Sequence, residues 1–123
     1  MRYVDGYVLP IPKKRLQAYR RLAQKAGKIW REHGALQYVE AAGDDLKVKW
    51  GIPFPRMLKL KPGETVVFSF IVFKSRTDRD RVNAKVMKDP RLAKMMEMMT
   101  DPKSRLFDPK RMVYGGFKIL VEK

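Results

Sequence analysis

The sequence predicts an α+β fold of the ferredoxin-like type, in which a βαββαβ chain forms a four-stranded antiparallel sheet with its helices on one face. Two observations carry this prediction. Thr65–Phe73 is β-branched and aromatic almost throughout, which is typical of a strand, and both of its faces are apolar. Lys13–His33 has apolar residues at steps of three and four, which is typical of an amphipathic helix. Right-handed connections would place the first and third strands in the centre of the sheet.

Length and composition narrow the class of protein. A chain of 123 residues is long enough for one domain with a core, and 45% hydrophobic residues argue against disorder. The absence of cysteine excludes disulfides, thiol nucleophiles and cysteine metal sites. The longest apolar run is too short to cross a bilayer, and the N-terminus lacks the apolar core of a signal peptide. We therefore expect a cytoplasmic protein with no membrane partner.

The first half of the chain gives the first strand, the first helix and the second strand. Tyr3–Leu9 is expected to be a strand, which Pro10 and Pro12 end. Of its two faces, we expect the one with Val4, Gly6 and Val8 to pack under a helix. Gly34 is suited to end the helix, and Ala35–Ala42 forms the second strand.

Gly43–Glu64 is a long connection rich in glycine and proline. Within it, Arg56–Leu60 is expected to pair briefly as an edge strand. Trp50, Ile52 and Phe54 are unusual for a solvated loop, so we expect them to dock on the body of the protein or on a partner subunit.

The second half of the chain supplies the remaining elements. Ser75–Asp78 resembles a capping box that opens a second helix, and Asp89-Pro90 starts another short helix. The methionines of that helix either fill the core or form a lid. Asp101–Lys110 is expected to be a polar loop. Met112–Glu122 is the last strand, in which Gly115-Gly116 indicates a bulge, a bend or a close approach.

The apolar third strand needs cover on both faces. The helices cover one face. We therefore expect a homodimer that stacks two sheets face to face and leaves a cavity beside the interface.

The best candidate for chemistry is the cluster Tyr3, Asp5 and Tyr7 on the first strand, because an apolar cavity would suit Asp5 for proton transfer. Alternatively, Asp5 makes a structural hydrogen bond to the backbone or to an arginine such as Arg111. His33, the single histidine, is either catalytic or a residue that caps and packs the first helix.

The preferred functional hypothesis is a small apolar or aromatic ligand bound on the non-helical face of the sheet. The expected cavity is closed and lined by Tyr7, Phe70 and Tyr114. Phosphate-loop, zinc-helix and serine-elbow motifs are missing, so no metal or cofactor is predicted and enzymatic activity stays open. The candidate ligand-binding residues are Tyr38, Glu40, Phe70, Arg111 and Tyr114.

The net charge of +15, from 28 Lys and Arg against 13 Asp and Glu, supports an alternative hypothesis. Either it is a solvated surface charge, or the protein is a nucleic-acid-binding module that uses helix 13–33 and loop 46–61. The candidate residues for the second interpretation are Lys13, Lys14, Arg20, Arg21 and Lys28.

Four distinctive blocks occur in order along the chain: Tyr3–Val8, His33–Leu36, Asp89–Arg91 and Lys110–Phe117. Together they resemble the YbaA-like family, a domain family of unknown function. The resemblance spans nearly the whole chain and implies the dimeric α+β-barrel fold, in agreement with the residue patterns. The chain departs from the family in its basic Leu46–Leu60 loop and its high charge.

Overall fold

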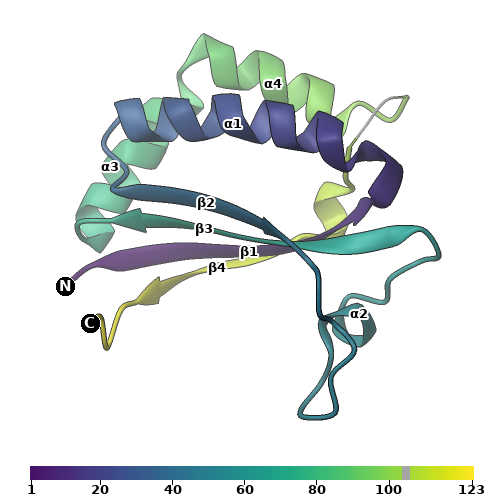
Figure 1. The fold of residues 1–123 in the computed structure, drawn as a ribbon. Coiled ribbons are helices and arrows are strands. Elements are labelled where there is room, and N and C mark those ends of the chain that lie inside the picture. Colours follow the sequence, from purple (N-terminus) through teal and green to yellow (C-terminus); the bar gives the residue numbers. More distant parts are fainter. Residues whose placement is uncertain (104–105) are drawn as a thin grey trace.

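The computed structural model describes residues 1–103 and 106–123 and shows one antiparallel sheet of strand order β2-β3-β1-β4. The three longer helices cover one face of this sheet, and the other face is open (Figure 1). The strands are β1 (Tyr3–Pro12), β2 (Gln37–Ala42), β3 (Glu64–Phe73) and β4 (Val113–Lys118). The helices are α1 (Leu16–Glu32), α2 (Phe54–Met57), α3 (Arg76–Met87) and α4 (Pro90–Thr100), with short 3-10 turns at Lys13–Arg15 and Pro109–Arg111. The predicted ferredoxin-like α+β fold, with β1 and β3 central, is confirmed.

The two faces of β1 are the reverse of the prediction. Leu9 and Ile11 are almost fully buried in the core beside Tyr19 and Ala23 of α1. The helices therefore cover the face that carries Tyr3, Asp5, Tyr7, Leu9 and Ile11, and the expected packing of Val4, Gly6 and Val8 under a helix is wrong. The expected strand ended at Leu9, but β1 continues to Pro12. Ile11 therefore joins Leu9 on the same face, and these two large apolar residues make it the face that packs under the helices.

Helix starts agree with the sequence. The Ser75 side chain accepts a hydrogen bond from the Asp78 backbone N–H at the start of α3, and the Asp89 side chain accepts one from Arg91 at the start of α4. On α4, Met95 and Met99 are buried in the core, while Met96 and Met98 are exposed. The methionines therefore divide between core filling and surface.

Two details of the connections differ from or refine the expectations. The expected edge strand at 56–60 is wrong, because its first two residues belong to α2 and the others follow that helix. Pro53 and Pro55 favour the start of a helix at this point. Gly116 is a close approach: a methyl group there would lie 2.5 Å from the Tyr3 hydroxyl. Residues 104 and 105 of the expected 101–110 loop lie outside the described part of the chain.

The open face of the sheet is apolar. Val4 of β1 pairs with Val72 of β3 and with Phe117 of β4. Val8 pairs with Phe68 of β3 and with Val113 of β4. Phe68 is 46% exposed and Phe117 is 59% exposed. This chain alone leaves large apolar side chains of the open face in contact with solvent.

Candidate functional site

A cleft of about 900 Å³ lies between α1 and the edge strand β2, on the helical side of the sheet. Its apolar lining includes Leu16, Ala23 and Val67. Such a volume is in the range of small-molecule sites. The sequence placed the cavity on the non-helical face. The cleft described here lies on the opposite side, between α1 and the segment 36–42.

Glu40 and two tyrosines form a polar cluster in this cleft. The Tyr19 hydroxyl donates to Glu40 Oε1 at 2.7 Å, and the Tyr38 hydroxyl donates to Glu40 Oε2 at 2.6 Å. Burial, and then the negative charge of Glu40, raise the pKa of Tyr19 and of Tyr38 well above the ordinary value. Both phenols therefore stay neutral and act as donors at physiological pH. Each carboxylate oxygen keeps capacity for a further donor.

Gly27 of α1 brings the helix close to the Tyr38 ring. A methyl group at Gly27 would lie 2.7 Å from Tyr38 Cδ1, well inside van der Waals contact. Glycine at this position therefore allows the backbone of α1 to lie directly on the ring. Beyond Gly27, Arg31 donates to the backbone oxygens of Ala35 and Leu36.

Three cations line the α1 side of the cleft entrance. Arg20, Lys28 and Arg31 line it, and all three are exposed. They follow one side of α1 because residues at steps of three to four share a helix face. The site thus combines an anionic group inside, an apolar wall and a basic rim.

A row of polar residues crosses the sheet to reach this cluster. Tyr7 pairs with Tyr114 on one side and with Ser69 on the other, and Ser69 pairs with Glu40. The rings of Tyr7 and Tyr114 are stacked, with centroids 5.4 Å apart. Burial, followed by the charge of Asp5, raises the pKa of Tyr7. Tyr7, Tyr114, Tyr38 and Glu40 therefore share the helical face, whereas Phe70 points to the open face. The expected cavity lined jointly by Tyr7, Phe70 and Tyr114 is wrong.

Asp5 is fully buried beneath α3 and does not line the cleft. Arg79 Nη1 donates to its Oδ1 at 2.7 Å, and Asn83 Nδ2 donates to its Oδ2 at 3.2 Å. Trp30 Nε1 donates in turn to Asn83 Oδ1 at 3.0 Å, and the Arg79 guanidinium lies over the Tyr3 ring. The arrangement favours the structural alternative for Asp5, with Arg79 as the arginine.

Arg111 has a different partner from the one expected. Its guanidinium donates to both oxygens of Glu64, at 2.6 and 2.9 Å, and so joins the turn before β4 to the start of β3. A bidentate pair of this kind is geometrically specific. This contact removes Arg111 from the neighbourhood of Asp5.

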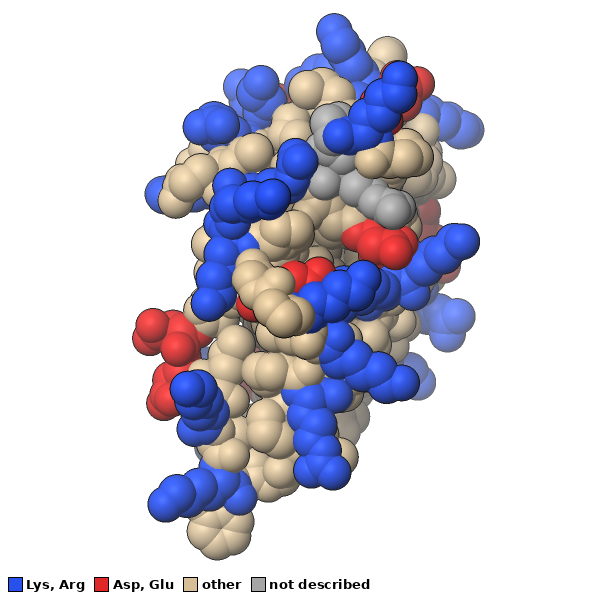
Figure 2. All heavy atoms as spheres, turned by 90° about the vertical axis from the view of Figure 1, so that its right-hand side faces the viewer, with Lys and Arg blue, Asp and Glu red and all other residues tan. Residues whose placement is uncertain are grey.

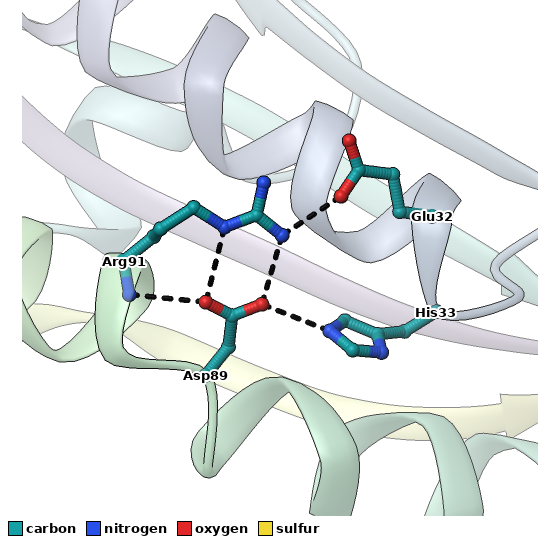
Figure 3. A network of polar contacts seen from close by, with 4 residues as sticks. All are labelled: Glu32, His33, Asp89 and Arg91. Carbon is teal, nitrogen blue, oxygen red and sulfur yellow. Dashed lines mark hydrogen bonds and ion pairs between the residues drawn. The ribbon is translucent and has the colours of Figure 1, made fainter.

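His33 belongs to a network between α1 and α4 (Figure 3). Its Nε2 lies 2.9 Å from Asp89 Oδ2, and Arg91 bonds to both Asp89 and Glu32. The bonds from Arg91 and from His33 hold the pKa of Asp89 well below its ordinary range. Because Asp89 also caps α4, the network fastens the end of one helix to the start of another. This geometry favours the capping and packing interpretation of His33.

The basic candidates for nucleic acid are exposed, and Arg20 and Lys28 among them line the cleft. Lys13, Lys14, Arg20, Arg21 and Lys28 all lie on the surface. Figure 2 shows Lys and Arg side chains spread over one end of the molecule, with Asp and Glu between them. The charge distribution at this end is therefore mixed.

Residues 1–103 and 106–123 hold no group of three or more His, Asp or Glu side chains placed to bind a metal ion. This part of the chain also has no helix with the length and apolar character needed to span a bilayer.

Sequence comparison places the chain among known proteins. The model of a family described as "Protein of unknown function (DUF1428)" matches residues 2–103. The uncharacterized protein YbaA of Escherichia coli (strain K12) is 39% identical over 122 residues, which cover 99% of this chain and 99% of that protein. The chain belongs to the DUF1428 family. The resemblance to YbaA-like proteins is thereby confirmed, and this DUF1428 protein shares almost its entire length with YbaA.

Solved structures extend the comparison to the fold. A dimeric ferredoxin-like protein from an uncultured marine organism matches with a TM-score of 0.61 at 9% identity, covering 99% of this chain and 98% of that chain. A nipsnap family protein with unknown function from Agrobacterium tumefaciens matches with a TM-score of 0.59 at 16% identity, covering 96% and 87%. At such identities the likeness shows the fold of this DUF1428 protein alone.

Several residues of the site could not be selected from the sequence. Tyr19 belongs to the apolar stripe of α1 and Gly27 lies outside it, while Arg79 and Asn83 are two of the many polar residues of α3. A glycine inside a strongly amphipathic helix was the available signal, since such a glycine often marks a close approach.

Proposed function

We propose that this protein binds a small organic molecule in the cleft between α1 and β2. The observation that supports the proposal is the carboxylate of Glu40, which two tyrosines hold in place inside a cleft of about 900 Å³. A buried or half-buried carboxylate that retains acceptor capacity is a recognition group for a ligand donor. Here Glu40 takes the role of a ligand-binding residue that the sequence suggested for it, together with Tyr38.

The chemistry of the cleft suggests the type of ligand. Leu16, Ala23 and Val67 offer an apolar wall for an aromatic or aliphatic body. Glu40 accepts a hydrogen bond from an amine or hydroxyl group of the ligand. Arg20 and Lys28 at the entrance attract an anionic group. The proposed ligand therefore has an apolar body, a donor at one end and an acidic group at the other.

The proposal includes a homodimer in which two open sheet faces meet. Phe68, Val113 and Phe117 are each about half exposed on that face, and contiguous exposed apolar surface is typical of an interface. A solved neighbour of the same fold is described as dimeric, which supports the proposal by analogy. A dimer would bury the second face of β3, as its apolar sequence requires.

A fluorescent aromatic sulfonate tests the binding site. The probe is 1-anilinonaphthalene-8-sulfonate, which has an aromatic body, an N–H donor and an acidic group. We expect Glu40→Gln and Arg20→Glu each to weaken its binding about tenfold, the size of one charge-assisted contact. The matched controls on α4, Glu97→Gln and Lys94→Glu, should leave the affinity unchanged. Amide NMR shifts should centre on Gly27, Tyr38 and Glu40.

The result that would overturn the proposal is equal probe affinity in all five proteins, with amide shifts on the open face of the sheet instead. That outcome would return the ligand to the face where the sequence first placed it.

The alternative function, binding of nucleic acid, has one specific observation in its favour. The backbone N–H of Lys13 donates to Gly63 O at 2.8 Å, so the basic turn before α1 lies beside Gly63, two residues after loop 46–61. Binding through this surface should fall steeply with salt. The triple variant with Lys13, Arg20 and Arg21 changed to Glu should abolish it; binding that survives would exclude this surface.

A further inference from the structure

The connection between β2 and β3 carries the most exposed large apolar side chains outside the chain termini. We call residues 44–60 the arm. Trp50 is 91% exposed and Ile52 is 70% exposed, and Val48, Phe54 and Met57 are each between 41% and 49% exposed. Scattered exposed apolar residues are normal, but five of them within ten residues form a patch.

The arm has a defined conformation. Leu58 is buried, and the backbone bonds Leu58 N to Phe54 O, at 2.9 Å, and Leu60 N to Pro55 O, at 3.0 Å, close the turns of α2 and its end. Gly51 adopts a φ of +69° within a bend at 49–51, a conformation that favours glycine. The bonds order the 54–60 part of the arm, which carries Phe54 and Met57, so binding through these two side chains loses little conformational entropy.

The arm projects to the same side of the sheet as the open face (Figure 1). It leaves the sheet after Ala42, close to Ala41, which pairs with Phe68 on the open face. The exposed apolar residues of the arm and those of the open sheet face therefore lie on the same side of the molecule. One partner on that side can contact both.

We propose that the arm of each copy grips a second copy of this chain, with Trp50 and Ile52 buried against the partner. This inference rests on the homodimer of the proposed function and adds the element that holds it together. A twofold axis places the same contact in the complex twice, once for each arm. Tryptophan is enriched among the residues that dominate the affinity of interfaces.

Other occupants fit the arm less well. Its cations, among them Lys47, Lys49 and Arg56, would suit nucleic acid or an anionic bilayer. Trp50 and Phe54 could stack on bases, whereas Ile52 and Met57 could not. Nucleic acid or a flat bilayer bound to the arm would also leave the apolar open face of the sheet uncovered. A second copy covers both the arm and the open face.

The test measures the dimer and the environment of Trp50 together, in the full chain. Sedimentation equilibrium gives the dimer dissociation constant of the wild type and of Trp50→Ser/Ile52→Ser. Met87→Ser is the control, since Met87 is 62% exposed but lies on α3, on the helical side. Trp30 is the internal reference for fluorescence, because it is buried and bonded to Asn83. Phe68→Lys tests the sheet interface separately.

We expect a wild-type dimer in which Trp50 emits at short wavelength. The arm variant should raise the dissociation constant at least about tenfold while keeping its circular dichroism, and the control should not. A dimer that Phe68→Lys dissociates but the arm variant leaves unchanged would overturn the inference and keep the dimer. A wild-type monomer at all concentrations would overturn both. A shift of Trp50 emission only with anionic vesicles or RNA would assign the arm to that partner and overturn this inference.

Discussion

Two carboxylates on the helical face of the sheet, Asp5 and Glu40, resemble each other in chemistry and differ in surroundings. Each accepts hydrogen bonds from two side chains: Asp5 from Arg79 and Asn83, Glu40 from Tyr19 and Tyr38. Asp5 is fully buried on a central strand under α3. Glu40 lies on an edge strand and lines a cleft.

The position of the strand in the sheet decides whether a carboxylate is enclosed, as Asp5 is on central β1, or accessible, as Glu40 is on edge strand β2. On the central strand β1, the neighbours on both sides and the helix above close the space around Asp5, so every donor it meets belongs to the protein. On β2, which has a neighbour on one side only, the layer of helices ends and leaves the Glu40 cluster at a rim. None of the described buried side-chain polar atoms lacks a partner, so both clusters are satisfied in the free chain.

The largest expected effect is the loss of the Asp5 charge. Asp5→Asn keeps the volume but leaves Arg79 without its buried carboxylate, so we expect the free energy of unfolding to fall by about 3 kcal/mol. Glu40→Gln, the matched change in the accessible cluster, should cost less than about 1 kcal/mol because water and an amide oxygen replace the lost contacts. Urea unfolding measures both. Equal losses would show that Glu40 is as structural as Asp5.

The next effect concerns the contact that shapes the accessible cluster. Alanine is favoured over glycine in a helix by about 1 kcal/mol. Gly27→Ala should nevertheless destabilise the protein by about 1 kcal/mol, because the new methyl group meets the Tyr38 ring. In a Tyr38→Ser background the same change should be stabilising. A double-mutant cycle, measured by thermal unfolding, gives the coupling energy between positions 27 and 38. Stabilisation by Gly27→Ala in both backgrounds would show that the Tyr38 ring does not oppose the new methyl group.

The smallest effect is seen only in alkali. The pKa values of Tyr7, Tyr19 and Tyr38 are raised in the folded protein, whereas the unfolded chain ionises its tyrosines near pH 10. The folded state is therefore favoured below pH 10, and this contribution is lost as the pH rises further. We expect the phenolate absorbance of these three tyrosines to appear only with unfolding. In Tyr19→Phe the free energy of unfolding should fall less steeply with rising pH than in the wild type, because one of the three shifted phenols is absent. Ionisation of all five tyrosines near pH 10 in the folded state would contradict the raised values.

The sequence predicted the fold well because its signals were local. The apolar period of α1, the caps Ser75 and Asp89, and the dense apolar run of β3 each follow from a few neighbouring residues, and together they leave one topology. The faces of β1 were assigned wrongly because the strand alternates aromatic and small residues, and neither set alone looks like a core. The continuation of the strand through Ile11 shows which face is buried. Pro10 and Pro12 predicted that the strand ends before Ile11, so this residue was not counted as part of it.

The site was predicted only in part, because it depends on contacts between distant segments. Tyr38 and Glu40 were selected from their shared strand face, which register alone defines. The partners of Glu40 and Asp5 lie on helices whose rotation over the sheet sets the contact. Nothing in the local pattern of α3 distinguishes Arg79 and Asn83 from the other polar residues of a mostly polar helix.

The way α1 rests on β2 has a mechanical consequence. The helix is fastened at one end by the bond from Tyr19 to Glu40 and at the other by the bonds of Arg31 to the backbone after the helix. Between these two points its backbone at Gly27 lies on the flat ring of Tyr38. The opposite side of the same segment carries Ala26 and Ile29, which are buried in the core. The two anchors and these buried side chains together hold α1 at one height above β2, and this height sets the width of the cleft.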